Sequence, residues 1–341
     1  MANWSARRNP HRSIVAAGSD RTHASMSSFT AARMVLRKPW LWSYAGALVV
    51  WLVTLGGVRG QGAGGIIAAA LTFSVFLVLV GFGQMLVITS GPGNIDLSVP
   101  STITFAGVVA MQLMGGQNDM IVTGALAAVA VGVVVGSLNY GLIRLLRIPP
   151  IIATMSSSFL VQSMAISYGR GARAMPPSDL VAFANGRVLG VPYTAIAAVA
   201  LAIALGYVTA RSVYGRSLSA LGQNAGAARL AGIRIERTRY FTYAFCAVLA
   251  ALTGYLLAAF SGGATLDMGD DYMLSSIAVT VIGGTAVAGG RASVPGIWGA
   301  ALFLFLMVTM LNALGVGAGL RLVMTGVLII GIIIFASNRK N

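Results

Sequence analysis

The chain has 341 residues, of which 57% are hydrophobic and only 9% are charged, so the composition predicts a membrane protein rather than a soluble one. The formal net charge of +15 could suit a nucleic-acid-binding protein, but the cations are spread along the chain without stacking aromatic residues between them. We interpret them instead as topology signals and contacts to anionic lipids. The single cysteine, Cys246, excludes an intrachain disulfide.

Residues 1–38 are rich in Ser, Arg and Ala and are predicted to form a basic cytoplasmic tail. Their short apolar piece, Ile14 to Gly18, is too small for the core of a secretory signal. The composition also suits an organellar transit peptide, and this alternative stays open.

Ten windows without Asp, Glu, Lys or Arg follow between Pro39 and Asn338. A helix needs about 20 residues to cross the hydrocarbon core, so the windows predict an all-α polytopic protein with about ten transmembrane helices. We expect one transmembrane domain, 39–338, and a cytoplasmic end, 339–341. The windows are 39–58, 60–95, 97–118, 120–143, 148–169, 188–210, 240–266, 272–290, 292–320 and 322–338.

The basic residues indicate the orientation, because loops rich in Lys and Arg stay cytoplasmic. With both termini inside, 18 of the 23 Lys and Arg fall in inner segments and 5 in outer ones. The outer ones are Arg59, Arg170, Arg173, Arg187 and Arg321. Cytoplasmic N- and C-termini are therefore expected.

The stretch SGPGNIDLSVPS, Ser90 to Ser101, places a carboxylate among residues that break helices. The next window keeps only about 14 continuous apolar residues after it, which is short for a crossing, so irregular backbone is expected inside the membrane region. Interrupted segments mark translocation sites in transporters. The candidate pathway residues here are Ser90, Asn94, Asp96 and Ser98. Asp96 could instead cap the following helix or remain hydrated near the inner interface.

A second interruption is predicted where Gly-Gly pairs follow an apolar run. Small residues also line close helix contacts in membranes, which is the alternative for each glycine. The candidate pathway residues in this segment are Gly283, Gly284, Thr285, Gly289 and Gly290.

Two longer segments are predicted to lie outside the membrane. The outer one, 169–190, contains a short amphipathic piece after Pro176-Pro177 that could lie on the membrane surface, although an ordinary loop fits equally well. The inner one, 211–239, contains a short helix, because Asn224 is a good N-cap and Gly232 suits the left-handed residue that ends a helix.

The small side chains of this inner helix would let another protein approach closely, and nearby arginines could pair with acidic residues of that protein. A solvated basic linker is the alternative. The candidate docking residues are Gly215, Arg216, Ala220, Gly222, Asn224, Ala227, Ala228, Gly232 and Ile233.

Four stretches together resemble the permease subunits of ABC importers of the ribose/xylose/arabinose class, the branch that also includes branched-chain amino acid permeases. They are TSGPGNIDLSVPS from Thr89, PPIIATMSS from Pro149, GRSLSALGQNAGAARLAGI from Gly215 and AVTVIGGTAVAGGRASVPGIWGA from Ala278. The resemblance covers roughly residues 40–336. This chain departs from the family pattern by its Pro92-Gly93-Asn94 insertion, by Pro100 and by Val294-Pro295.

The resemblance implies that two permeases pair with a two-cassette ABC ATPase in a bacterial inner membrane. A periplasmic solute-binding protein would deliver a small polar solute, most naturally a monosaccharide. No Walker A sequence occurs in the chain, so ATP and Mg are expected in the partner ATPase and no cofactor in this chain. The chain is therefore predicted to be a transport subunit rather than an enzyme.

The residues leave two other classes of function to weigh. An ion-coupled secondary carrier or a channel normally uses several intramembrane acids or histidines, whereas both histidines lie in the tail and only Asp96 lacks a ready place in a soluble loop. An intramembrane enzyme would need metal ligands or a base beside a nucleophile. Asp267, Asp270 and Asp271 could bind a cation, but a hydrated loop end or a rim that meets the binding protein is favoured, and no metal is expected.

Overall fold

The structure, a computed structural model, describes residues 40–57, 63–170 and 175–317, with short pieces at 319–320, 323–324, 326–327 and 330–331. All of them belong to one compact unit, Pro39–Asn341. The predicted basic tail, the short cytoplasmic end and most of the tenth apolar window lie outside the described residues.

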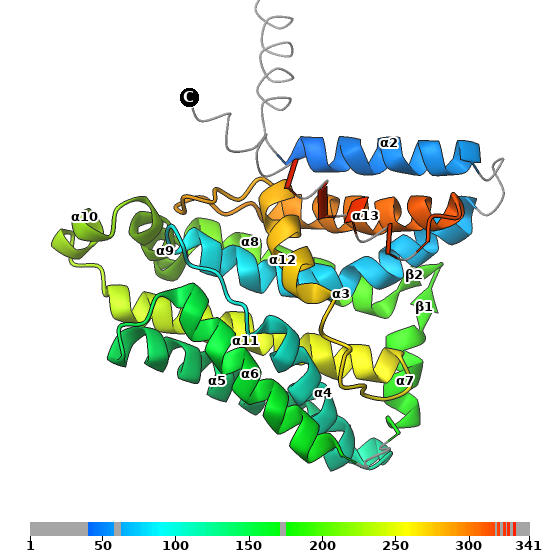
Figure 1. The fold of residues 1–341 in the computed structure, drawn as a ribbon, viewed down its shortest axis with the longest axis horizontal. Coiled ribbons are helices and arrows are strands. Elements are labelled where there is room, and N and C mark those ends of the chain that lie inside the picture. Colours follow the sequence, from blue (N-terminus) through cyan, green and yellow to red (C-terminus); the bar gives the residue numbers. More distant parts are fainter. Residues whose placement is uncertain are drawn as a thin grey trace, which may run out of the picture. The chain divides into compact units, whose positions relative to one another are not determined.

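The unit is built from helices and one short hairpin (Figure 1). The helices are α2 (Leu41–Gly57), α3 (Ala63–Thr89), α4 (Val99–Met114), η1 (Asn118–Met120), α5 (Ile121–Leu145), α6 (Pro150–Gly169), α7 (Ser178–Asn185), α8 (Tyr193–Arg211), α9 (Val213–Gln223), α10 (Ala225–Leu230), α11 (Ile235–Phe260), α12 (Tyr272–Ile282) and α13 (Val294–Ala313). The strands β1 (Arg187–Val188) and β2 (Val191–Pro192) pair antiparallel, with Arg187 opposite Pro192.

Each of the first nine apolar windows contains an apolar helix, which confirms a helical membrane protein. Within the described residues, six helices are long and apolar enough to cross a membrane: Gly64–Thr89, Asn118–Leu145, Pro150–Gly169, Tyr193–Arg211, Ile235–Phe260 and Val294–Ala313. The helices at Leu41–Gly56, Val99–Met114 and Tyr272–Ile282 are shorter. The window 272–290 is not one continuous helix, since α12 has only 11 residues, about 17 Å at 1.5 Å per residue.

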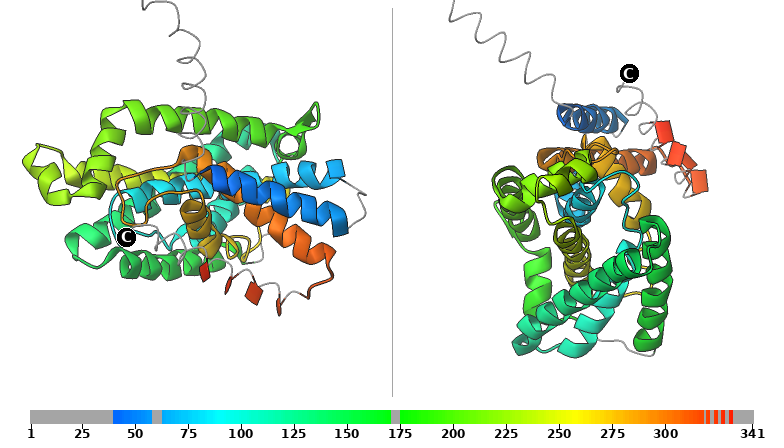
Figure 2. Two further views of the ribbon diagram at one scale, coloured as in Figure 1. Left: turned by 90° about the horizontal axis from the view of Figure 1, so that it is seen from above. Right: turned by 90° about the vertical axis from the view of Figure 1, so that its left-hand side faces the viewer.

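Helix α11 forms the centre of the unit. Its best apolar window is 67% buried, compared with 17% for α8, which lies at the periphery. It packs against α3, α4 and α5, while α13 packs against α2, α3 and α12. Figure 2 shows α11 nearly end-on between these helices when the unit is viewed from the α10 end.

Two glycines one turn apart bring α5 and α11 into backbone contact. A Cβ at Gly132 would lie 2.6 Å from the Cα of Val248, and one at Gly136 would lie 2.6 Å from the Cα of Ala244. Only glycine fits at such distances, so small-xxx-small spacing holds the central helix against its neighbour.

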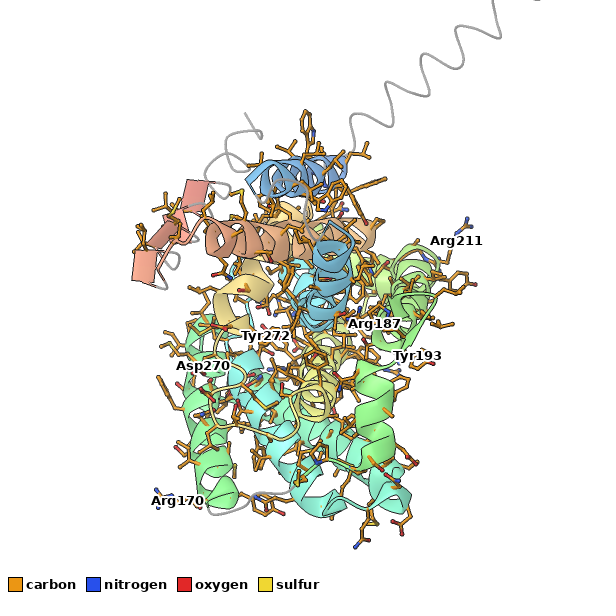
Figure 3. The ribbon with its side chains drawn as sticks, turned by 90° about the vertical axis from the view of Figure 1, so that its right-hand side faces the viewer. Arg170, Arg187, Tyr193, Arg211, Asp270 and Tyr272 are labelled. Carbon is orange, nitrogen blue, oxygen red and sulfur yellow. The ribbon has the colours of Figure 1, made fainter. Side chains whose placement is uncertain are left out.

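The described part of the outer segment that follows residue 174 folds back onto the bundle. The predicted amphipathic piece is α7, but its buried face, with Leu180 and Ala184, joins the cluster around α4 and α11, so it packs on protein. At the hairpin, Nη2 of Arg187 donates to Oγ1 of Thr72, 3.2 Å away, and Figure 3 shows Arg187 beside Tyr193 at the start of α8.

Candidate functional site

The first predicted interruption lies between α3 and α4; its tip, Pro92-Gly93, is exposed, whereas Asn94, Asp96 and Ser98 are buried. Gly91 (φ 139°) and Gly93 (φ 74°) turn the chain with backbone angles that favour glycine. The side chain of Asn94 donates to the Gly91 carbonyl at 3.1 Å and accepts from the hydroxyl of Tyr243 on α11, also at 3.1 Å. The broken segment is therefore tied to the central helix.

The carboxylate of Asp96 holds the broken segment in place through hydrogen bonds to Ser98 and Asn139. This carboxylate, in a side chain only 2% exposed, accepts hydrogen bonds from the backbone N–H of Ser98 (2.9 Å) and from its hydroxyl (2.6 Å). The side-chain amide of Asn139 donates to it at 3.3 Å, and the Cys246 thiol lies beside it. The N-cap residue of α4 is Ser98, so Asp96 fixes the turn before the helix rather than capping the helix itself.

Asn139 extends the network to α6. Its amide also donates to the Ser98 hydroxyl at 2.7 Å, and its oxygen accepts from the hydroxyl of Ser157. One turn earlier on α6, Oγ1 of Thr154 accepts from the Leu97 N–H at 3.0 Å and donates to the Ile95 carbonyl at 3.2 Å. Polar side chains of α5 and α6 thus replace the backbone partners that a helix would supply.

Helix α3 supplies a further partner. The side-chain amide of Gln84 is oriented so that its nitrogen faces the backbone carbonyl of Asp96 and its oxygen faces the backbone N–H of Asp96. In this orientation the nitrogen donates and the oxygen accepts, both at 3.3 Å. Gln84 is completely buried. Sequence reasoning did not assign Gln84, Asn139, Thr154 or Ser157 to the site, although lone amides inside apolar windows are the signal that could have identified the first two.

The second predicted interruption is also present. Helix α12 ends at Ile282, and Gly284 (φ 87°), Gly289 (φ 87°) and Gly290 (φ 80°) shape the loop that leads to α13. At its start, Gly283 and Gly296 touch backbone to backbone, so a side chain on either one would clash. The side chain of Thr285 is buried, and its hydroxyl has no partner within the described part of the chain.

The two interruptions meet through their glycines. The N–H of Gly290 donates to the carbonyl of Thr89, the last residue of α3, at 2.9 Å. A Cβ at Gly289 would lie 2.7 Å from the Cα of Gly91. Of the predicted pathway residues, the structure brings Gly289 and Gly290 against Gly91 and Thr89, the two neighbours of Ser90, and joins Asp96 to Ser98. No described contact links Gly283, Gly284 or Thr285 to Asp96.

A third segment, α9, ends at the same place. Gly222 lies so close to the Thr89 carbonyl and the Gly290 N–H that a methyl group could not fit there, and a Cβ at Gly289 would lie 3.0 Å from the Gly222 carbonyl. We call this contact of Thr89, Gly91, Gly222, Gly289 and Gly290 the glycine junction. It joins the predicted docking segment directly to both interruptions.

The predicted short helix in 211–239 is α10. The side chain of Asn224 caps it by accepting from the Ala227 N–H at 3.0 Å. Gly232 has φ 79°, and the N–H of Ile233 donates to the Ala228 carbonyl at 3.0 Å, which closes the helix in a Schellman-type turn. The amphipathic helix α9 before it was not predicted.

The predicted docking residues divide between two faces. Arg216, Asn224, Ala227 and Gly232 are exposed; Ala220 and Ile233 are half-buried; Gly215, Gly222 and Ala228 are buried. Ala228 is therefore not on the free face of α10, because the helix turns that position toward its own protein. Leu230, which the sequence did not single out, is 93% exposed and is the largest apolar group on the free face.

Polar contacts fasten the docking segment to the bundle. Glu236, in the first turn of α11, forms ion pairs with Arg144 at 3.0 Å and Arg229 at 3.8 Å, and accepts from the Tyr140 hydroxyl at 2.7 Å. From α9, the hydroxyl of Tyr214 lies 2.9 Å from that of Thr242, and burial raises the pKa of Tyr214 to about 12.

Among the described residues, no group of three or more His, Cys, Asp or Glu side chains is arranged to hold a metal ion. That includes the acidic loop at Asp267, Asp270 and Asp271. The site residues form two partly buried breaks between helices, and α9 contacts both of them.

Comparison with known proteins decides the family. Residues 66–336 match the family described as the permease component of branched-chain amino acid transport systems. The chain belongs to this permease family. No solved structure matches it.

Three relatives illustrate the range of the family. The permease is 31% identical to the ribose import permease of Escherichia coli K12 over 261 residues, 75% of this chain and 80% of that one. It is 31% identical to the fructose import permease of Bifidobacterium longum over 275 residues, 79% and 75% of the two chains. It is also 31% identical to a probable ABC transporter permease of Sinorhizobium fredii over 257 residues, 74% and 76%.

Proposed function

We propose that this permease forms the translocation pathway of an ATP-driven importer for a small sugar, and that α9 and α10 receive the motion of the partner ATPase. The glycine junction is the observation that supports this most directly. It places the end of a surface helix in backbone contact with both interrupted segments, so a displacement of α9 must move them.

In the proposed topology, the chain crosses the membrane ten times and both termini lie in the cytoplasm. The distribution of basic residues supports it, and α9 and α10 then lie on the cytoplasmic side, where an ATPase would be. The exposed Leu230 would enter an apolar pocket of the partner, and Arg216 and Arg234 would meet acidic residues at its rim.

The proposed assembly contains two copies of the permease or a pair of related subunits, a two-cassette ATPase that binds ATP and Mg, and a periplasmic solute-binding protein. The membrane is the bacterial inner membrane. The names of the ribose and fructose relatives favour a monosaccharide. A relative at 29% identity, from Enterobacter, is an autoinducer 2 permease, so a signalling molecule remains a second candidate.

An ion-coupled carrier fits the site less well. Proton coupling needs an acid or histidine that can exchange protons with the pathway. Among the described membrane segments, Asp96 is the acid in question, and its carboxylate is buried and occupied by Ser98 and Asn139.

The test is purification of the tagged chain from its own host in mild detergent, followed by mass spectrometry and reconstitution into vesicles. A stoichiometric two-cassette ATPase and ATP-dependent uptake of ribose or fructose are expected. Uptake by the chain alone without ATP would contradict the proposal.

A further inference from the structure

The uncharged part of α11 provides a depth scale. Residues 240–260 carry no Asp, Glu, Lys or Arg and extend about 32 Å, close to the thickness of about 30 Å of a hydrocarbon core. In the proposed topology their midpoint, near Ala250, lies close to the middle of the membrane. Val99 and Ile103 of α4 belong to the same buried cluster as Ala250. The first interruption therefore ends, at the start of α4, near mid-membrane depth.

The chain that follows α11 returns to this depth without forming a helix. Residues 261–271 contain only turns and irregular backbone, and Figure 1 shows them running from the end of α11 to the start of α12. A Cβ at Gly269 would lie 2.1 Å from the Pro100 carbonyl oxygen, and Tyr272 packs against the cluster that contains Ala250. Residues 261–271 thus cover the outer half of a crossing whose inner half is α12, about 17 Å long.

This outer half presents carboxylates to the outside of the chain. Asp267, Asp270 and Asp271 are exposed, and none of them belongs to an ion pair within the described residues. At membrane depth, irregular backbone is tolerated only inside protein or beside water, and a carboxylate against lipid is costly. The exposed side of 267–271 therefore requires water beside it.

Helix α6 continues this surface. The side-chain amide of its Gln162 donates to the Leu266 carbonyl at 2.8 Å, which holds α6 beside the irregular segment. On α6, Ser156 and Ser163 lie two turns apart and are both exposed, and α6 is the least hydrophobic of the six long apolar helices. We call the exposed side chains of Ser156, Ser163 and 267–271 the outer polar face.

Helix α8 provides the contrast of a lipid-facing helix. Its best apolar window is 17% buried and that of α6 is 28% buried, so both helices present most of their surface to the outside. From 196 to 204, however, every exposed side chain of α8 is Ala, Ile or Val. Exposure alone thus does not bring serine or aspartate to the surface of this bundle.

We infer that the outer polar face lines the outer half of the aqueous pathway, and that the same face of a second copy of the chain forms the opposite wall. Within the described part of the chain nothing covers this face, so the second copy separates its water from lipid. The inference rests on the proposed function, which supplies the two copies. It assigns the lining to exposed side chains such as Asp270 and leaves Asp96, whose buried carboxylate faces protein, outside it.

The test measures the reactivity of single thiols in the assembled complex, in right-side-out vesicles. Asp270→Cys places a thiol on the outer polar face, Ile203→Cys places one on the exposed side of α8 near its middle, and Leu189→Cys places one on the hairpin tip. Cys246 is buried, so the unsubstituted chain gives the background. The reagent is a small methanethiosulfonate with a trimethylammonium group, which does not cross lipid.

The thiol of Asp270→Cys should react several-fold faster than that of Ile203→Cys and approach the rate of Leu189→Cys. Ser163→Cys repeats the comparison on α6 and should also react faster than Ile203→Cys, so the result does not depend on the folding of one variant. If both thiols of the outer polar face react as slowly as Ile203→Cys, the inference is overturned.

A reagent with two thiol-reactive ends tests the second copy. It should join Asp270→Cys of two copies into a product that contains the chain twice, and it should not do so with Ile203→Cys. Reaction of Asp270→Cys with the small reagent, but no such product with cross-linkers of increasing length, would overturn the assignment of the opposite wall.

Uptake separates this inference from the proposed function. Complete reaction of Asp270→Cys should lower ATP-dependent uptake of ribose or fructose several-fold while the ATPase stays bound, and reaction of Leu189→Cys should leave uptake unchanged. Unchanged uptake after complete reaction of Asp270→Cys would contradict the pathway assignment alone. Absence of an ATPase from the unsubstituted complex would contradict the proposed function instead.

Discussion

The N–H of Gly290 donates to the carbonyl of Thr89 across 2.9 Å, which joins the loop before α13 to the end of α3. Gly222 of α9 packs against both residues. The two interruptions and α9 thus share one contact built from backbone atoms, where a side chain at Gly222 or Gly289 would force the segments apart.

Gly222→Ala should therefore uncouple transport from ATP hydrolysis. Overpacking typically costs about 1–3 kcal/mol, which corresponds to a roughly 5–150-fold change in a coupled equilibrium. We expect ATP-dependent uptake to fall at least about tenfold within that range, while the ATPase stays bound and hydrolyses ATP. Gly206→Ala on α8, where nothing lies within 4 Å, is the matched control and should transport normally. Equal transport by both variants would contradict the proposal that the glycine junction couples ATP hydrolysis to transport.

Leu230→Asp should weaken binding of the ATPase. Burying a leucine contributes about 1.5–3 kcal/mol, so the apparent affinity should fall roughly tenfold or more. The folded chain should be unaffected, because Leu230 is 93% exposed. Leu189→Asp, at the other end of the bundle, is the control for an added charge, and co-purification quantified by mass spectrometry is the measurement. Undiminished recovery of the ATPase with Leu230→Asp would count against α10 as the docking helix.

Asp96→Asn should destabilise the permease. The Ser98 N–H and the Ser98 hydroxyl donate to one carboxylate oxygen, and the Asn139 amide faces both oxygens, so an amide at position 96 that keeps its oxygen toward Ser98 turns its NH2 toward the NH2 of Asn139. An unsatisfied buried group costs about 1–3 kcal/mol, and the melting temperature in detergent should fall. Adding Asn139→Asp restores one acceptor and should recover part of the loss. A double variant no more stable than Asp96→Asn would show that the pair does not act as described.

Gly136→Ala should loosen the central helix pair. The new methyl group would lie 2.6 Å from the Cα of Ala244, so α5 and α11 must separate, at a cost of about 1–3 kcal/mol. Gly141→Ala on the same helix meets nothing within 4 Å and should be neutral or slightly stabilising. Thermal unfolding of the two purified variants gives the comparison, and equal melting temperatures would argue against the tight contact.

Features that depend on residues close together in the sequence could be predicted from the sequence alone. Long uncharged windows predicted the helices because the bilayer sets their length and composition. Asn224 and Gly232 predicted α10 because caps satisfy backbone groups within a few residues. The helix breaks around Asp96 and Gly290 followed in the same way, from residues with local preferences for turns.

The tertiary structure decided which side chains meet. That Asn139 and Ser157 complete the site of Asp96, and that Ala228 points inward while Leu230 points outward, depends on how α5, α6 and α10 pack. No periodicity in the chain specifies such packing. The glycine junction and the contact of Gly269 with Pro100 are likewise made by segments far apart in sequence, because burial of backbone groups between helices selects the partners only once the bundle has formed.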